Sequence, residues 1–167
     1  MRDSAQYLDI DDWSSDAMGE IDHRLVKAPY VRLSAFKKGI RSDAVYVFDL
    51  RVTQPGQNFM TTELIHSMEH FLLYGFREHL PHSFVSVAPM GCQTGFYLVT
   101  LNESGKETIC NAYKNALEYI LRASSVPYAN PRDCGQSVHH SLAQCQNIAW
   151  YLLDNQAGWL DVFEQAA

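Results

Sequence analysis

The sequence lacks both a long apolar run and a concentration of positive charge. No stretch approaches the roughly 20 consecutive apolar residues of a membrane-spanning helix, so no such helix is predicted. The 13 lysines and arginines are outnumbered by 19 aspartates and glutamates, which gives the 167 residues a formal net charge of −6. The basic residues form no stripe. We therefore expect neither nucleic acid nor a membrane surface as the principal partner.

A secretory leader is also missing from the N-terminus. Residues 1–20 (MRDSAQYLDIDDWSSDAMGE) contain no basic start, apolar middle or small-residue cleavage site. We therefore expect a cytoplasmic protein, whose four cysteines are thiols rather than disulfides. Cys110 and Cys145 fall beside apolar stripes of predicted helices, where a thiol acts as a small hydrophobic group. We expect both of them in the core.

The chain has no internal repeat and no low-complexity linker, which favours a single domain. With 47% hydrophobic residues it has enough apolar material for a core, so extended disorder is excluded for most of it. Residues 1–19 differ, because they concentrate aspartate and offer few apolar anchors. We expect them to form a loosely held acidic extension before a domain of residues 20–167.

Strand patterns and helix patterns are mixed without a regular strand–helix–strand repeat. Residues 30–36, 44–52, 84–88 and 96–101 are rich in β-branched and aromatic residues. The last two segments are joined by seven residues that include two glycines, which suits a hairpin. This mixture predicts an α+β fold in which one antiparallel sheet packs against about three helices.

Three segments show helical periodicity. The first covers residues 62–80, where apolar side chains recur every three or four positions. The second is predicted to begin at Ser104, because Ser104 and Glu107 have the spacing of a capping box. The third is predicted to begin at Ser141, with Gln144 in the box position.

The most informative segment is residues 66–70 (HSMEH), inside the first predicted helix. One helical turn separates His66 from His70, so both imidazoles can reach a single metal ion. Glu69 lies on a neighbouring flank, where its carboxylate can act as a base. The helix is apolar around most of its circumference, which indicates burial on two sides. Buried histidines need polar partners, and a metal ion is one.

A third ligand must come from another segment. His139 and His140 are candidates, although they equally suit a polar lead-in to the third helix. Cys134 is another, because a thiolate on a flexible, glycine-containing loop can close onto a metal that two helix histidines hold. Cys92 lies at the mouth of the predicted hairpin. A thiol there can have a lowered pKa near a metal cation and act as an acid, base or nucleophile; a structural thiol in a tight turn is the alternative.

The same pentapeptide fits H-x-x-E-H, the signature of inverted zinc peptidases. That resemblance is confined to five residues, and the chain is too short for the multidomain architecture of those enzymes. A metallopeptidase is therefore an alternative hypothesis.

Five motifs in order resemble the S-ribosylhomocysteine lyase (LuxS) family, the autoinducer-2 synthases. The resemblance spans about residues 20–155 and rests on residues 28–32 (APYVR), 48–55 (FDLRVTQP), 66–70 (HSMEH), 89–98 (PMGCQTGFYL) and 134–135 (CG). It implies an enzyme that cleaves S-ribosylhomocysteine to homocysteine and 4,5-dihydroxy-2,3-pentanedione, by carbonyl migration and β-elimination.

The resemblance also implies which residues carry the chemistry. His66, His70 and Cys134 would hold one divalent metal ion per subunit, Fe(II) in the family. Two imidazoles and a thiolate suit Zn(II) or Co(II) as well. Glu69 and Cys92 would be the two acid/base groups that move protons between neighbouring carbons.

Substrate contacts are implied for Arg51, His23 and Asp22. In the family, the segment that contains His23 helps to complete the site of the partner subunit. The resemblance therefore implies a homodimer with composite sites.

Three positions depart from the family pattern. Ser67 replaces a threonine inside the metal motif and keeps the hydroxyl. Met18 stands where the family has a substrate-binding serine, and Ser86 stands where it has an aspartate. These last two departures motivate a second hypothesis, a non-catalytic homologue that binds metal or ligand without turnover.

Overall fold

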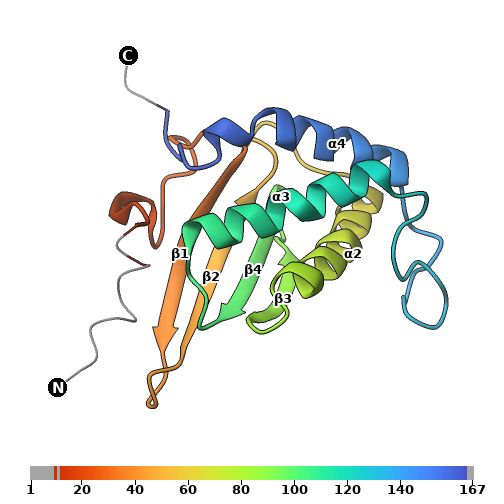
Figure 1. The fold of residues 1–167 in the computed structure, drawn as a ribbon. Helices are drawn as coiled ribbons and strands as arrows, with labels where there is room; N and C mark the ends of the chain where they lie inside the picture. Colours follow the sequence, from red (N-terminus) through yellow and green to blue (C-terminus); the bar gives the residue numbers. More distant parts are fainter. Residues whose placement is uncertain (1–9, 11, 165–167) are drawn as a thin grey trace.

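The computed structural model describes residue 10 and residues 12–164. Its strands are β1 (Tyr30–Lys38), β2 (Ala44–Arg51), β3 (Phe84–Pro89) and β4 (Gly95–Leu101). Its helices are α2 (Thr62–His79), α3 (Lys106–Arg122) and α4 (Leu142–Asp154), with short 3-10 turns η2 (Ser15–Ala17) and η3 (Gln156–Gly158). The strands form one antiparallel sheet in the order β1-β2-β4-β3. Figure 1 shows α2, α3 and α4 stacked on one side of this sheet.

The predicted α+β architecture is therefore confirmed. The four predicted strands and the three predicted helices are all present, and their boundaries shift by only a few residues. None of the helices in the described part of the chain combines the length and the apolar character that crossing a bilayer requires.

The two faces of the sheet have different surroundings. Phe48 and Leu98, which point toward the helices, are fully buried. The side chains that alternate with them along β2 and β4 point the other way. Among these, Val45, Tyr97 and Leu101 are 38%, 43% and 39% exposed. This surface is called the open face below, and it consists of Val45, Val47, Tyr97, Val99 and Leu101.

Side chains cap two of the three helices. Thr61 precedes α2 and accepts a hydrogen bond from the Leu64 amide. Ser141 precedes α4 and accepts one from the Gln144 amide, as the sequence pattern predicted. Each cap satisfies an amide that has no partner within the helix.

The capping box predicted for α3 is wrong. The helix begins at Lys106, and its N-cap, Gly105, has no side chain that could cap the helix. Ser104 is only 3% exposed, and its carbonyl accepts a hydrogen bond from Trp13 Nε1 at 2.7 Å. This long-range contact holds Ser104 just outside the helix, so Ser104 is not the N-cap and does not form the capping box with Glu107.

The acidic N-terminal segment packs against the sheet where the structure describes it. Trp13 and Ala17 are 6% and 4% exposed. The Trp13 ring lies 5.5 Å from the ring of Phe48 in β2. The expectation of a loosely held extension is therefore wrong for this part, because a tryptophan anchors it. Residues 1–9 and 11 lie outside the described residues.

The cysteines are all free thiols, as predicted. Cys145 is fully buried, and Cys110 packs partly buried against the same hydrophobic core. Burial raises the pKa of Cys110 to about 11 and that of Cys145 to about 12. Both thiols therefore remain protonated and unreactive near neutral pH.

Replacing Gly75 by alanine tests the close approach of α2 and α3. A Cβ atom at Gly75 would overlap the Ala116 side chain and lie 3.0 Å from Ala116 Cα. We expect Gly75→Ala to lower the free energy of unfolding by about 1–3 kcal/mol, because overpacking outweighs the gain in helix propensity. Urea unfolding followed by circular dichroism measures the change. Gly158→Ala is the control, since a Cβ atom there meets nothing within 4 Å. Unchanged or increased stability of Gly75→Ala would contradict the close packing.

Candidate metal centre and reactive cysteine

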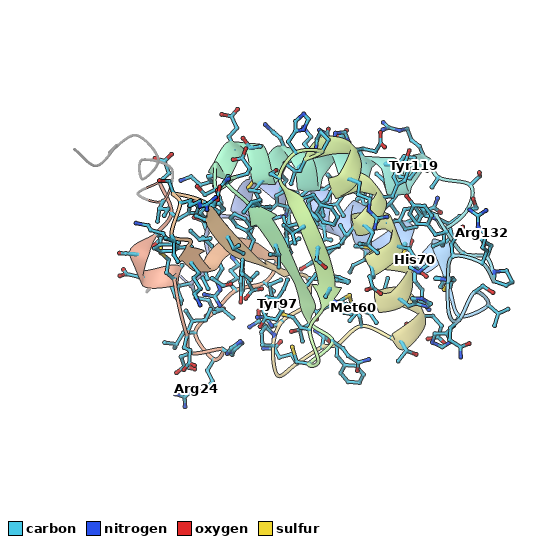
Figure 2. The ribbon with its side chains drawn as sticks, turned by 90° about the horizontal axis from the view of Figure 1, so that it is seen from below. Arg24, Met60, His70, Tyr97, Tyr119 and Arg132 are labelled. Atoms are coloured by element: carbon cyan, nitrogen blue, oxygen red, sulfur yellow. The ribbon has the colours of Figure 1, made fainter. Side chains whose placement is uncertain are left out.

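Four potential metal ligands converge where α2 meets the loop of residues 123–141. The ligand atoms of His66, His70, Cys134 and His140 all lie within 4.8 Å of one another. Cys134 Sγ is 3.4 Å from His66 Nε2 and 3.6 Å from His140 Nε2. Figure 2 shows His70 on the side of the molecule where Arg132, in the same loop, also lies. The structure thus brings together the three residues that the resemblance implied.

The helix supplies two of these ligands in the expected way. His66 and His70 are one turn apart in α2, and their ring centroids lie 4.8 Å apart with perpendicular planes. Cys134 is 9% exposed, and its amide donates to the Asn130 carbonyl in a turn of the loop. The loop therefore presents the thiol to the helix from a fixed position.

The loop backbone also fixes which ring nitrogen of each helix histidine carries a proton. His66 Nδ1 lies 2.9 Å from the His139 carbonyl, and His70 Nδ1 lies 2.7 Å from the Pro127 carbonyl. A carbonyl oxygen can only accept, so each Nδ1 must carry the proton. In the neutral imidazole each Nε2 then has the free lone pair that metal binding requires, and both rings belong to the cluster.

Ser67 fixes the third imidazole through its single hydroxyl proton. Ser67 Oγ donates to the Glu63 carbonyl at 2.7 Å and accepts from the Ser141 amide at 2.8 Å. Its remaining lone pair faces His140 Nδ1 at 3.1 Å, so that nitrogen is the donor. His140 Nε2 therefore also presents a lone pair to the cluster.

The donor set fits a divalent transition-metal ion. Burial, and after it the neighbouring His66 and His70, lower the pKa of His140 to about 4, so this imidazole is neutral near pH 7. The separations of 3.4 and 3.6 Å from Cys134 Sγ match the roughly 3.5 Å between adjacent ligands of a tetrahedral nitrogen and sulfur site. His140 is therefore a fourth candidate ligand. The His139 imidazole instead contacts Thr62 Oγ1 at 2.9 Å.

A second polar cluster surrounds Cys92 at the tip of the β3–β4 hairpin. It lines a pocket of about 570 Å³ together with His23, Arg51, Thr94 and residues 55–59. Burial opposes ionisation of Cys92, but hydrogen bonding by Thr94 and the charge of Arg51 outweigh it and lower the pKa of the thiol. Cys92 is therefore more easily ionised than Cys110 or Cys145.

Arg51 is an internal residue rather than a surface arginine. It is 2% exposed and pairs with the fully buried Asp49, with Arg51 Nη2 2.7 Å from the carboxylate. Arg32 Nε contacts the same carboxylate at 3.1 Å. Asp49 was not among the site residues predicted from the sequence. Its signal was the two-residue spacing from Arg51, which puts both side chains on one face of a strand.

Of the remaining predicted site residues, His23 alone lines the Cys92 pocket. His23 Nε2 lies 3.5 Å from Arg51 Nη2. Asp22 is held by Arg24 at 2.6 Å, and the hydrogen bonds from Arg24 lower the pKa of Asp22 to about 2. Glu69 is partly buried on α2, next to His70. The pocket lining includes none of the four metal-donor residues.

Two of the three departures from the family pattern, Met18 and Ser86, lie outside this pocket. Met18 packs partly buried against the hydrophobic core. Ser86 is exposed on β3, where the pairing with β4 shifts register. Neither side chain lines the Cys92 pocket.

Comparisons with known proteins show the family of this chain. The model of the S-ribosylhomocysteinase (LuxS) family matches residues 18–163. An S-ribosylhomocysteine lyase of Halobacillus halophilus is 41% identical over 143 residues, which cover 86% of this chain and 93% of the relative. Lyases of Dichelobacter nodosus (41% identical, covering 86% and 92%) and of Helicobacter pylori strain HPAG1 (39% identical, covering 85% and 91%) are similarly related. The chain therefore belongs to the S-ribosylhomocysteinase (LuxS) family.

Proposed function

We propose that this protein is a metal-dependent lyase that cleaves S-ribosylhomocysteine to homocysteine and 4,5-dihydroxy-2,3-pentanedione. The observation that carries the proposal is the convergence of His66, His70 and Cys134, in a chain that belongs to the LuxS family. Family membership argues against the alternative of an H-x-x-E-H peptidase. A non-catalytic binding homologue, which Met18 and Ser86 motivated, predicts that no thiol is released.

His66, His70 and Cys134 would hold the metal ion, with His140 beside them. The family implies Fe(II), and the donor set accommodates Zn(II) or Co(II) equally well. When bound, a divalent ion supplies a Lewis acid for an oxygen atom of the sugar. The hydrogen bonds to the His139 and Pro127 carbonyls keep two imidazoles ready for it without rearrangement.

Proton transfer is assigned to Glu69 and Cys92. The reaction moves a carbonyl group along the sugar and then eliminates the thiol, so protons must repeatedly leave and return to neighbouring carbons. A carboxylate and a thiol with a lowered pKa are suited to this exchange near neutral pH. Arg51 and His23 would bind the substrate in the Cys92 pocket. Asp22, next to His23 in the chain, would also bind the substrate. In this structure its carboxylate forms an ion pair with Arg24.

We further propose that the complete site forms between two copies of the chain in the cytoplasm. The pocket around Cys92 contains no metal donor, although the proposed reaction needs both groups at one substrate. The open face exposes apolar side chains such as Tyr97 and Leu101, which a second copy would cover. A symmetric dimer through this face would form two equivalent composite sites.

Thiol release from S-ribosylhomocysteine tests the proposed activity. The metal-loaded protein should release homocysteine, detected with a thiol reagent. Glu69→Ala and Cys92→Ala should each lower kcat about 10²-fold or more while retaining metal, because each removes an acid/base group. Glu78→Ala, on an exposed position of α2, and Cys110→Ala are the controls. A metal-loaded wild type that releases no thiol would refute the lyase assignment. Full turnover in either test variant would refute the role of that residue.

The two adjacent histidines of the loop should differ in their effect on metal affinity. We expect His140→Ala to weaken Co(II) binding about tenfold or more, since its Nε2 lies in the donor group. His139→Ala should bind Co(II) as the wild type does, because the contact with His66 comes from the His139 backbone carbonyl. Titration monitored by the visible absorption of Co(II) measures both affinities. Equal affinities of the two variants would contradict this difference.

Paired inactive variants test the composite site. A heterodimer of a Glu69→Ala chain and a Cys92→Ala chain, purified through two different tags, contains one intact site if each site uses Glu69 of one chain and Cys92 of the other. It should then show about half of the wild-type turnover. Turnover no higher than that of the separate variants would place both residues of a site in one chain.

A further inference from the structure

A threonine hydroxyl lies between the arginine and the cysteine of the pocket. Thr94 is 4% exposed. Its Oγ1 is 2.6 Å from Arg51 Nη1 and 3.0 Å from Cys92 Sγ. We propose that Thr94 is a positioning residue, whose hydroxyl, oriented by Arg51, donates a hydrogen bond to the Cys92 thiolate. The inference rests on the proposed function only for the acid/base role of Cys92.

The donors and acceptors present when Cys92 is ionised fix the direction of these two hydrogen bonds. A guanidinium group can only donate, so Arg51 occupies one lone pair of Thr94 Oγ1. Among the described residues, the other hydrogen-bond partner of this oxygen is Cys92 Sγ. An ionised Cys92 has no proton to donate, so the single hydroxyl proton of Thr94 is then directed to the thiolate. This hydrogen bond is charge-assisted only when Cys92 is ionised.

Arg51 is itself held by the buried carboxylate of Asp49. Asp49 Oδ1 and Oδ2 accept from Arg51 Nε at 3.2 Å and from Arg51 Nη2 at 2.7 Å. These two bonds fix the plane of the guanidinium and leave Nη1 for Thr94 and for Cys92, 3.7 Å away. Arg32 secures Asp49 from the other side, and its Nη1 donates to the Ala17 and Gly19 carbonyls. The hydroxyl of Thr94 thus meets a cation that has little freedom to move.

The backbone places Thr94 in register with this pair. The amides of Val52 and Thr53, which follow β2, donate to the Thr94 carbonyl at 2.9 and 3.1 Å. Gly95 pairs with Arg51 across the strands, and a Cβ atom on Gly95 would lie 3.1 Å from Arg51 Cα. The absence of that Cβ lets the two strands approach closely at the pocket.

The charged groups around the pocket favour the ionised thiol. Arg51 faces Cys92 from β2, and the imidazole of His23, from the N-terminal segment, lies beside Arg51 and lines the same pocket. The negative charge of Asp49 lies behind Arg51, and the second arginine on that carboxylate, Arg32, offsets it. The Tyr30 hydroxyl also contacts Asp49, at 3.3 Å, and the Tyr30 ring lies 5.7 Å from the guanidinium. The lowered pKa of Cys92 accords with this arrangement.

Alkylation of Cys92 at a series of pH values tests the proposal. The full-length, metal-loaded protein without substrate is treated with iodoacetamide, and mass spectrometry follows the Cys92 peptide separately from those of the other cysteines. Thr94→Val keeps the shape of the side chain and removes the hydroxyl. We expect it to raise the apparent pKa of Cys92 by about one pH unit. Thr94→Ser should restore the wild-type profile. Thr100→Val is the matched control, since that buried threonine on β4 bonds the Glu103 carbonyl instead.

A Thr94→Val profile that coincides with the wild type would overturn the proposal, as would Thr94→Ser behaving like Thr94→Val. If Thr94→Val does not fold, judged by circular dichroism, the folded Thr94→Ser and Thr94→Ala pair is compared in the same way, and equal profiles count against the proposal. The titration requires no turnover. Absence of thiol release by the wild type would therefore refute the lyase assignment without affecting this result.

Discussion

The hydrogen bonds from histidine Nδ1 atoms to loop carbonyls are the constraint on which the metal site depends. His66 and His70 project from a rigid helix, but a free imidazole can carry its proton on either nitrogen. The carbonyls of His139 and Pro127 remove that choice. Both belong to the loop that also carries Cys134, so the same segment supplies a ligand and prepares the other two. The metal site and the loop conformation are therefore coupled, since moving the loop would break both of these hydrogen bonds.

The second cluster is organised by a buried charge rather than by backbone carbonyls. Asp49 is fully buried, yet it has two arginines and a tyrosine hydroxyl as partners, so its charge is compensated. Removing one partner of such a group is costly, because it leaves the other charge unsatisfied. The strand that carries Asp49 and Arg51 thus forms part of the sheet and, through Arg51, also lines the Cys92 pocket. Within one chain the two clusters share no residue.

The sequence predicted those features of the site that depend on residues close together in the chain. The spacing of His66 and His70 was sufficient for a metal hypothesis, because helical periodicity is a short-range property. The meeting of Cys134 with these histidines depends on the loop fold, so the sequence left His139, His140 and Cys134 open as the third ligand, and the family resemblance selected Cys134. Ser104 shows the opposite case: a valid capping pattern gave way to a contact with Trp13, which is 91 positions away in sequence. Thr94 was missed because its importance arises from a neighbour on another strand.

The packing of Trp13 has a consequence for where this domain begins. Similarity to the family starts at residue 18, whereas the hydrophobic core extends at least as far back as Trp13. A version of the chain trimmed to the homologous region would lose the Trp13 indole. This ring packs against Phe48 and donates a hydrogen bond to the Ser104 carbonyl, just before α3. In this protein, the hydrophobic core extends beyond the N-terminal boundary of the family match.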